Sequence, residues 1–125
     1  MLVAAEKGEF DMNAIATSTR SVVGDFIAAV NQHDRDQVLA LVTADCMIEI
    51  PTAPPAGIRF ETQPENQSFW TDVLSADEES LSLDASIATT EDRAVIRWRS
   101  VRQHGIYIVR VRDGKVSELM VYGWD

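Results

Sequence analysis

The last third of the sequence constrains the fold more than any other part. Four runs follow one another there in which apolar and polar residues alternate, the pattern of half-buried strands. Their bounds are residues 81–90, 93–102, 105–112 and 115–124. The last two runs are separated by Asp113-Gly114, and an Asp-Gly pair between alternating runs is among the strongest sequence indications of a β-hairpin. We therefore expect the chain to end in a four-stranded antiparallel meander.

The front of the chain has helical periodicity instead. Apolar residues recur at helical spacing over residues 15–30, and the Thr-Ser-Thr run at 17–19 offers candidate caps. Asp34 and Thr62 each precede a Gln or Glu by three positions, which is the spacing of a capping box. We expect them to begin a second and a third helix, with one strand, Asp45–Ile50, between these helices. Helices followed by a meander predict an α+β domain.

Length and charge narrow the function classes. At 125 residues and 46% hydrophobic, the chain is expected to form one domain, residues 17–125, with residues 1–16 as an N-terminal arm or helix extension. The formal charge of −9 argues against nucleic acid and against anionic membrane surfaces as partners. No apolar run reaches membrane-spanning length, and the first residues lack the apolar core of a signal peptide. A cytoplasmic location is therefore expected.

Cysteine and histidine give little support for a metal or redox site. The single cysteine, Cys46, excludes an intrachain disulfide and lies in an apolar strand pattern, so we expect it to be buried and inert. The two histidines are far apart, and no Cys/His/Asp cluster surrounds either of them, so no metal site is expected. His33 is expected to have a solvated or capping role. His104, in a turn between strands, is a candidate for either a structural or a catalytic role.

Two stretches together resemble the SnoaL-like group of the NTF2-like superfamily. The front stretch, FIAAVNQHDRDQVLALVTADCMIEIP, has the group's helix, Asn-x-x-Asp turn, short helix, Ala-Asp step and strand ending in proline. The back stretch, YIVRVRDGKVSELMVYGWD, matches the R-x-R-D-G-K-[IV]-x-E hairpin followed by an aromatic residue. The resemblance covers residues 17–125, and the order and spacing of the motifs carry it.

The resemblance implies a cone. Three N-terminal helices would pack in a strongly curved, mixed and mostly antiparallel sheet, with a pocket inside and a homodimer formed through the outer face of the sheet. The superfamily includes isomerases, cyclases, dehydratases, epoxide hydrolases and non-catalytic binders, so the fold alone does not assign a reaction. No cofactor is implied.

The best-known catalytic carboxylates of the superfamily are not in place here. The resemblance puts the base of the ketosteroid isomerase branch at Ile50, its oxyanion tyrosine at Phe26 and its protonated aspartate at Tyr107. In the limonene epoxide hydrolase branch, the arginine-bearing strand aligns with VIRWRSVR, which has no acid between its arginines, and the second aspartate aligns with Val121. Whether the chain is an enzyme therefore stays open.

The polyketide cyclase relatives suggest a different acid. Their Y-x-D ending corresponds to Y-G-W-D, so Trp124 holds the acid position and Asp125 follows one residue late. A one-residue slip reverses the face of a strand residue unless a bulge, here at Gly123, absorbs it. His104 aligns with a histidine of related cyclases. If the protein is catalytic, we expect proton transfer or hydration with Tyr107 as hydrogen-bond donor and Asp125 or His104 as base.

Two functions are expected, from different classes. The first is small-molecule binding in an apolar conical pocket, which extends to a cofactor-independent acid/base enzyme (isomerase, cyclase or hydratase type) acting on a hydrophobic substrate. The second is a non-catalytic homodimeric interaction module with a filled cone. The register implied by the resemblance turns Ile50 towards the pocket and Glu49 away from it, because neighbouring strand residues face opposite sides. The expected pocket-lining residues are Phe26, Ile48, Ile50, Trp98, Leu119, Val121 and Trp124.

Overall fold

The computed structural model describes residues 12–51, 53, 56–75, 81–101 and 103–124. Residues 1–11 of the expected arm and the residue Asp125 lie outside the described part, as do the side chains of residues 12–18 and Trp124. The first helix begins at Met12 and runs across the expected boundary between residues 16 and 17. The division of the chain at that boundary stays a prediction.

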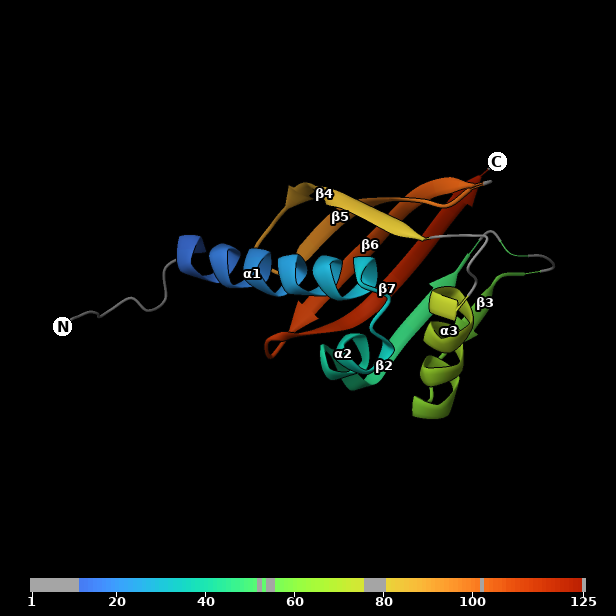
Figure 1. Cartoon of the computed structure of the whole chain (residues 1–125). Helices are drawn as coiled ribbons and strands as arrows, with labels where there is room; N and C mark the ends of the chain where they lie inside the picture. Colours follow the sequence, from blue (N-terminus) through green and yellow to red (C-terminus); the bar gives the residue numbers. More distant parts are fainter. Residues whose placement is uncertain (1–11, 52, 54–55, 76–80, 102, 125) are drawn as a thin grey trace.

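The described residues form three helices and six strands, and the predicted α+β class is confirmed (Figure 1). The helices are α1 (Met12–Asn31), α2 (Arg35–Ala40) and α3 (Gln63–Ser75). The strands are β2 (Val42–Ile50), β3 (Ile58–Phe60), β4 (Ser82–Thr89), β5 (Arg93–Arg99), β6 (His104–Arg112) and β7 (Lys115–Trp124). The short strand β3 was not expected from the sequence, and β2 begins three residues earlier than expected.

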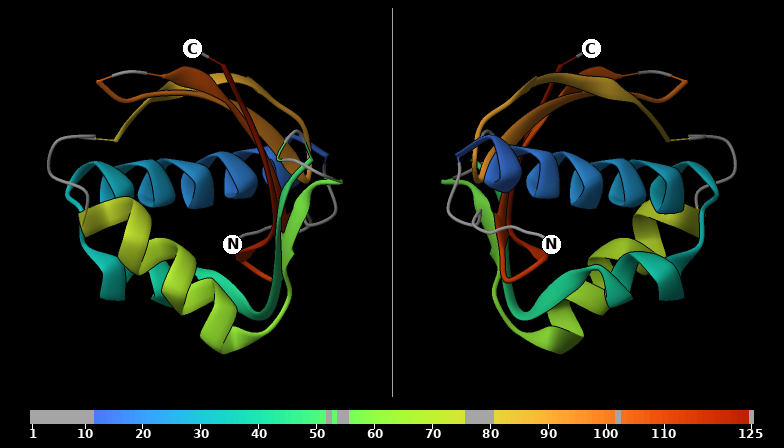
Figure 2. Two further views of the ribbon diagram at one scale, coloured as in Figure 1. Left: turned by 90° about the vertical axis from the view of Figure 1, so that its right-hand side faces the viewer. Right: turned by 90° about the vertical axis from the view of Figure 1, so that its left-hand side faces the viewer.

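The six strands form one mixed sheet in the order β3-β2-β7-β6-β5-β4. Neighbouring strands are antiparallel except β2 and β7, which run parallel. Parallel pairing requires a long connection, and here α3 and the strands β3 to β6 supply it. Figure 2 shows the sheet arching around α1, with α2 and α3 on the open side of the arch. This is the curved, mixed and mostly antiparallel sheet that the resemblance implied.

The predicted helix caps are confirmed at α2 and α3. Asp34 Oδ1 accepts a hydrogen bond from the Gln37 amide at 3.1 Å. Thr62 Oγ1 accepts one from the Glu65 amide at 3.3 Å, and Glu65 Oε1 accepts one from the Thr62 amide at 3.1 Å, which is a reciprocal capping box. The cap expected at residues 17–19 is wrong, because α1 begins at Met12. Thr19 lies inside α1, and its hydroxyl donates to the Glu91 carbonyl.

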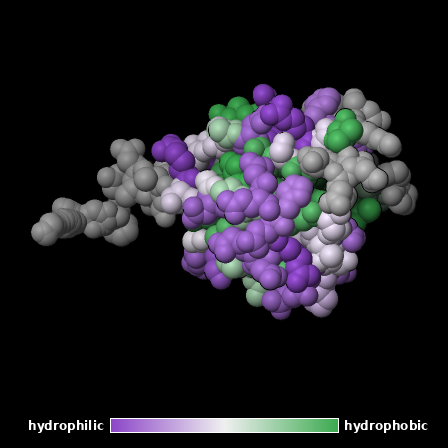
Figure 3. Space-filling view, in the orientation of Figure 1, coloured by the Kyte–Doolittle hydropathy of each residue, from purple (hydrophilic) through white to green (hydrophobic). Residues whose placement is uncertain are grey.

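The core lies between α1, α3 and the concave face of the sheet. Alternation along β5, β6 and β7 turns one side of each strand inward, and the buried residues include Ile96, Val109 and Leu119. Phe26 of α1 packs edge-on against Trp70 of α3, with ring centroids 5.7 Å apart. Figure 3 shows that hydrophilic residues cover most of the opposite, outward side of the helices. The helices therefore have one apolar face each, turned towards the sheet.

The turn after α1 ties this helix to the edge strand β4. The Asn31 carboxamide donates to the Leu83 carbonyl at 2.9 Å and accepts from the Leu83 amide at 2.7 Å. The His33 ring nitrogen Nε2 bonds the Leu81 carbonyl at 2.9 Å. His33 is half-buried and has a positive φ of 55°, so it is a structural residue of this turn rather than a solvated one.

We predict that Cys46 is unreactive in the folded protein. The residue is 1% exposed, and burial raises the pKa of its thiol to about 12, so the nucleophilic thiolate is scarce at pH 8. Native protein should react with Ellman's reagent only at the rate at which it opens, and protein unfolded in guanidinium should react at once. A rapid reaction of the native protein at pH 8 would contradict the buried position.

A second prediction concerns the capping box at α3. The change Thr62→Ala removes one side of the box, and we expect it to lower the free energy of unfolding by about 1 kcal/mol. Urea denaturation measures this difference. The control is Ser68→Ala on the exposed side of the same helix, which should change the stability by less than about 0.5 kcal/mol. Equal effects of the two changes would show that the box does not stabilise the domain.

Candidate ligand-binding site

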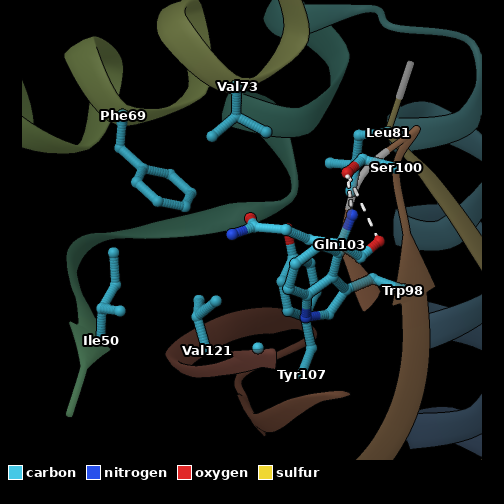
Figure 4. Close-up of a pocket in the computed structure, with 10 residues that line it drawn as sticks. Ile50, Phe69, Val73, Leu81, Trp98, Ser100, Gln103, Tyr107 and Val121 are labelled. Carbon is cyan, nitrogen blue, oxygen red and sulfur yellow. Dashed lines mark hydrogen bonds between the residues drawn. The ribbon is translucent and has the colours of Figure 1, made fainter. Parts of the chain in front are cut away.

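An open cavity of about 380 Å³ lies between α3 and the concave face of the sheet (Figure 4). Pockets for small molecules have volumes of about 300–1,000 Å³, so this cavity is at the lower end of that range. Its lining residues come from α3, from four strands and from the segments that flank β4 and β6. They are Ile50, Phe69, Val73, Leu81, Trp98, Ser100, Gln103, Tyr107, Val121 and Gly123.

Depth along each strand decides which inward residues reach the cavity. Ile48 and Ile50 face the same side of β2, and Leu119 and Val121 face the same side of β7. Ile48 and Leu119 are fully buried, whereas Ile50 and Val121 are only partly covered and line the cavity. The helices cover the middle of the strands and leave the carboxyl ends of β2 and β7 open. The cavity therefore lies at this end of the cone.

The structure brings together part of the set expected from the sequence. Ile50, Trp98 and Val121 line the cavity, and so does Tyr107. Phe26 lies in the core against Trp70 and does not line the cavity, and neither do Ile48 and Leu119. The reason is that a residue's side of the sheet follows from alternation, whereas its cover by helices follows from tertiary packing.

The wall of the cavity is mainly hydrocarbon and aromatic. Phe69 and Val73 project from α3 on one side, while Trp98 and Tyr107 project from the sheet on the other (Figure 4). The rings of Trp98 and Tyr107 are 6.2 Å apart and tilted by 36°. Among the described lining residues, none is an acid or a histidine. The lining therefore suits an apolar ligand.

Tyr107 is the most deeply placed polar residue of the lining. It is 2% exposed, and burial raises the pKa of its phenol above the ordinary value. A tyrosine hydroxyl is protonated at neutral pH even when it is exposed, and burial moves its pKa further in that direction, so Tyr107 can donate a hydrogen bond. The side chain projects from β6 into the cavity (Figure 4). It can act there as a donor to a carbonyl or hydroxyl oxygen of a ligand.

Ser100 and Gln103 add a polar rim that sequence reasoning missed. The Ser100 hydroxyl accepts from the Gln103 amide at 3.2 Å and lies 3.4 Å from the Gln103 carbonyl. The Ser100 amide donates to the same carbonyl at 2.8 Å. These bonds close the turn between β5 and β6, and the Gln103 side chain reaches into the cavity (Figure 4). One feature of the sequence could have indicated this rim: Ser100 comes two residues after Trp98, which was expected to face the pocket.

The expected catalytic residues are not brought together among the described residues. Tyr107 lines the cavity, so alternation along β6 turns His104 to the opposite face of the sheet, where it is exposed. The pairing of β6 with β7 is regular from His104–Trp124 to Arg110–Glu118, so Gly123 does not form the bulge that the sequence left open. Asp125 and the Trp124 side chain lie outside the described residues, so their roles stay predictions.

The outer face of the sheet carries both charged pairs and apolar residues. Glu49 faces away from the cavity, as expected, and pairs with Arg59 of β3 at 3.5 Å. Glu118 pairs with Arg110 at 3.1 Å. The same face carries half-buried apolar residues from four strands. They are Met47, Val95, Ile106, Ile108, Met120 and Tyr122.

No group of three or more His, Cys, Asp or Glu side chains within the described ranges could hold a metal ion. None of the helices in the described part of the chain has the length and apolar character needed to cross a membrane.

Solved structures with the same fold come from several bacteria. An NTF2-like protein of unknown function from Mesorhizobium loti is 24% identical, with a TM-score of 0.77 over 88% of this chain and 93% of that chain. A steroid delta-isomerase from Pseudomonas aeruginosa is 16% identical, with a TM-score of 0.70 over 86% of this chain and 80% of that one. A Mycobacterium tuberculosis protein in complex with estradiol-17beta-hemisuccinate is 18% identical, with a TM-score of 0.67 over 86% and 94%.

Sequence comparisons give the family. A search of curated proteins finds no match to this chain. The family model described as a SnoaL-like domain matches residues 23–119, from the middle of α1 to the middle of β7. The match includes both stretches that carry the resemblance except the last residues of β7. The chain belongs to the SnoaL-like domain family.

Proposed function

We propose that this protein binds a small hydrophobic molecule in the cavity between α3 and the sheet. The observation that carries the proposal is an open cavity of about 380 Å³ with apolar walls and one deeply placed donor, Tyr107. A large apolar pocket with a few convergent polar groups is the usual form of a small-molecule site. The open cavity also favours this function over an interaction module with a filled cone. Structures of the same fold include a steroid delta-isomerase and an estradiol-hemisuccinate complex, which supports the same class of ligand.

Tyr107 would orient the ligand. A donor inside an apolar cavity favours a ligand with a carbonyl or hydroxyl at its inner end, because an unpaired polar group on either side would be costly to bury. Gln103 at the rim carries both a donor and an acceptor and would take a second polar group or a bridging water. The expected ligand is therefore apolar over most of its surface and carries an oxygen at one end.

Catalysis is the second part of the proposal. Proton transfer next to a carbonyl needs a base as well as a donor that stabilises the developing oxyanion. Tyr107 supplies the donor. The base in this proposal is Asp125 or His104, and of the two His104 is on the outer face of the sheet. Because His104 is turned away from the cavity, Asp125 is the first candidate for substitution once a substrate is known.

We predict that Tyr107→Phe weakens the binding of a ketone more than the binding of a hydrocarbon-like probe. The two probes are Prodan, a naphthalene ketone, and N-phenyl-1-naphthylamine, which has no carbonyl; fluorescence titration measures both. Loss of one hydrogen bond should raise the dissociation constant of Prodan by about fivefold, or about 1 kcal/mol. The constant of the second probe should change little.

The matched control is Tyr122→Phe, because Tyr122 lies on the outer face of the sheet. It should leave the dissociation constants of both probes unchanged. Failure of the wild-type protein to bind either probe would reject the proposed function. Equal weakening of the two probes by Tyr107→Phe would reject the role of the hydroxyl but keep the binding site.

We also propose a homodimer through the outer face of the sheet. Ile106 pairs with Tyr122 and Ile108 pairs with Met120 across β6 and β7, so their side chains form one continuous apolar patch. Charged pairs, Glu49–Arg59 and Arg110–Glu118, flank this patch. An apolar centre with a polar rim is the usual anatomy of a protein interface.

The dimer leads to a fourth prediction. Sedimentation equilibrium at tens of micromolar should give twice the mass of one chain. Ile108→Arg, which places a charge in the middle of the patch, should give a monomer with an unchanged far-UV circular dichroism spectrum. Arg112→Glu at the end of β6 serves as a charge-changing control outside the patch. A monomeric wild-type protein would contradict the dimer.

A further inference from the structure

Trp98 lies across two glycines on the concave face of the sheet. Trp98 of β5 pairs with Gly105 of β6, and Gly105 pairs with Gly123 of β7, so the three residues form one row across three strands. The indole Nε1 donates to the Tyr122 carbonyl of β7 at 2.9 Å. The indole therefore reaches from β5 across β6 to β7. Two positions without side chains make this arrangement sterically accessible.

The two glycines differ in what a side chain would meet. A Cβ at Gly105 would collide with the backbone of β7, namely the Tyr122 carbonyl and, at 2.7 Å, the Gly123 Cα. A Cβ at Gly123 would meet only the indole at close range, with Cζ2 at 2.5 Å and Cη2 at 3.0 Å, while the nearest backbone atom, the His104 carbonyl, is 3.7 Å away. Gly105 is thus required by the sheet itself. Gly123 is required only by the position of the indole.

The cavity lies on the other side of the indole. Both Trp98 and Gly123 line the cavity, Gly123 as part of β7 itself. A side chain at position 123 would push the six-membered ring of Trp98 away from the sheet and break the hydrogen bond from Nε1 to Tyr122. The displaced ring would then occupy space that is now open to a ligand.

We propose that Gly123 determines the depth of the ligand cavity by letting the edge of the Trp98 indole approach β7 closely. The inference rests on the proposed ligand-binding function. It goes beyond that function by naming the residue that selects ligands by their size. A glycine at position 123 selects for ligands that fill the space left open by an indole held close to β7. Gly123 is a positioning residue, because it acts through Trp98 and not through a polar group of its own.

The test compares Gly123→Ala with the double variant Gly123→Ala/Trp98→Phe. Two neutral fluorescent probes of different size, N-phenyl-1-naphthylamine and the larger Nile red, are titrated into each protein. The single change should raise the dissociation constant of Nile red at least tenfold and that of the smaller probe by less. The double change should restore Nile red, because a phenyl ring leaves the space that the new methyl group needs. A role of Gly123 in folding alone would not give this rescue.

The matched control is Gly24→Ala in α1, where an added Cβ has no atom within 4 Å. It should leave both dissociation constants unchanged. If Gly123→Ala does not fold, the single variant Trp98→Phe tests the proposal instead. This change enlarges the cavity, so it should raise the affinity for Nile red relative to the affinity for the smaller probe. If the ratio of the dissociation constants of the two probes is the same in that variant as in the wild-type protein, the proposal is overturned. Equal loss of both probes in a folded Gly123→Ala protein, with no rescue by Trp98→Phe, would overturn it as well.

A crystal structure of Gly123→Ala tests the inference without any ligand. The indole should have left the Tyr122 carbonyl and entered the cavity. An indole in its original place would overturn the proposal, whatever the probes do. If the wild-type protein binds neither probe, the proposed function fails, and this structure still decides whether position 123 controls the depth of the cavity.

Discussion

The parallel pairing of β2 with β7 is the constraint on which the rest of the structure depends. β7 is the only strand that joins the early part of the chain to the terminal meander, among the strands that the structure describes. Ile48 pairs with Leu119 and Glu49 with Met120, so the next inward residues, Ile50 and Val121, meet at one end of the cone. Because this pair is in register, the cavity has a continuous apolar wall from β2 to β5. A slip by one residue would turn Glu49 inward.

The parts of the fold that local patterns encode could be predicted from the sequence. Alternation and the Asp113-Gly114 turn define the meander, and the Thr62 box defines the start of α3. The strand β3 could not be predicted, because its three residues follow a proline-rich loop and gain their partners only from β2. The cavity was partly predictable for a similar reason. Alternation gives the side of the sheet, whereas packing of the helices decides that Ile48 is covered and Ile50 is not.

The chemistry of the site depends on long-range packing even more. Tyr107 becomes a donor inside the cavity because the fold buries it there, whereas its phenol would be protonated at neutral pH even if it were exposed. The rim formed by Ser100 and Gln103 depends on a turn that is closed by hydrogen bonds between a side chain and the backbone. No residue pattern predicts that this turn lies at the mouth of a cavity. Hydrocarbon at Ile50, where the resemblance expects a base, is visible in the sequence. The structure adds that this hydrocarbon is part of the wall of an open cavity and not of a filled core.

The turn after α1 has a consequence for how the protein behaves at high concentration. β4 is an edge strand, and an edge strand exposes amide and carbonyl groups that can pair with another chain. The Asn31 carboxamide bonds both the amide and the carbonyl of Leu83, and His33 bonds the Leu81 carbonyl. Two side chains thus take the place of a neighbouring strand at the beginning of β4. The last residue of the first helix and a residue of the turn after it thus occupy backbone groups through which β4 could otherwise pair with a second chain.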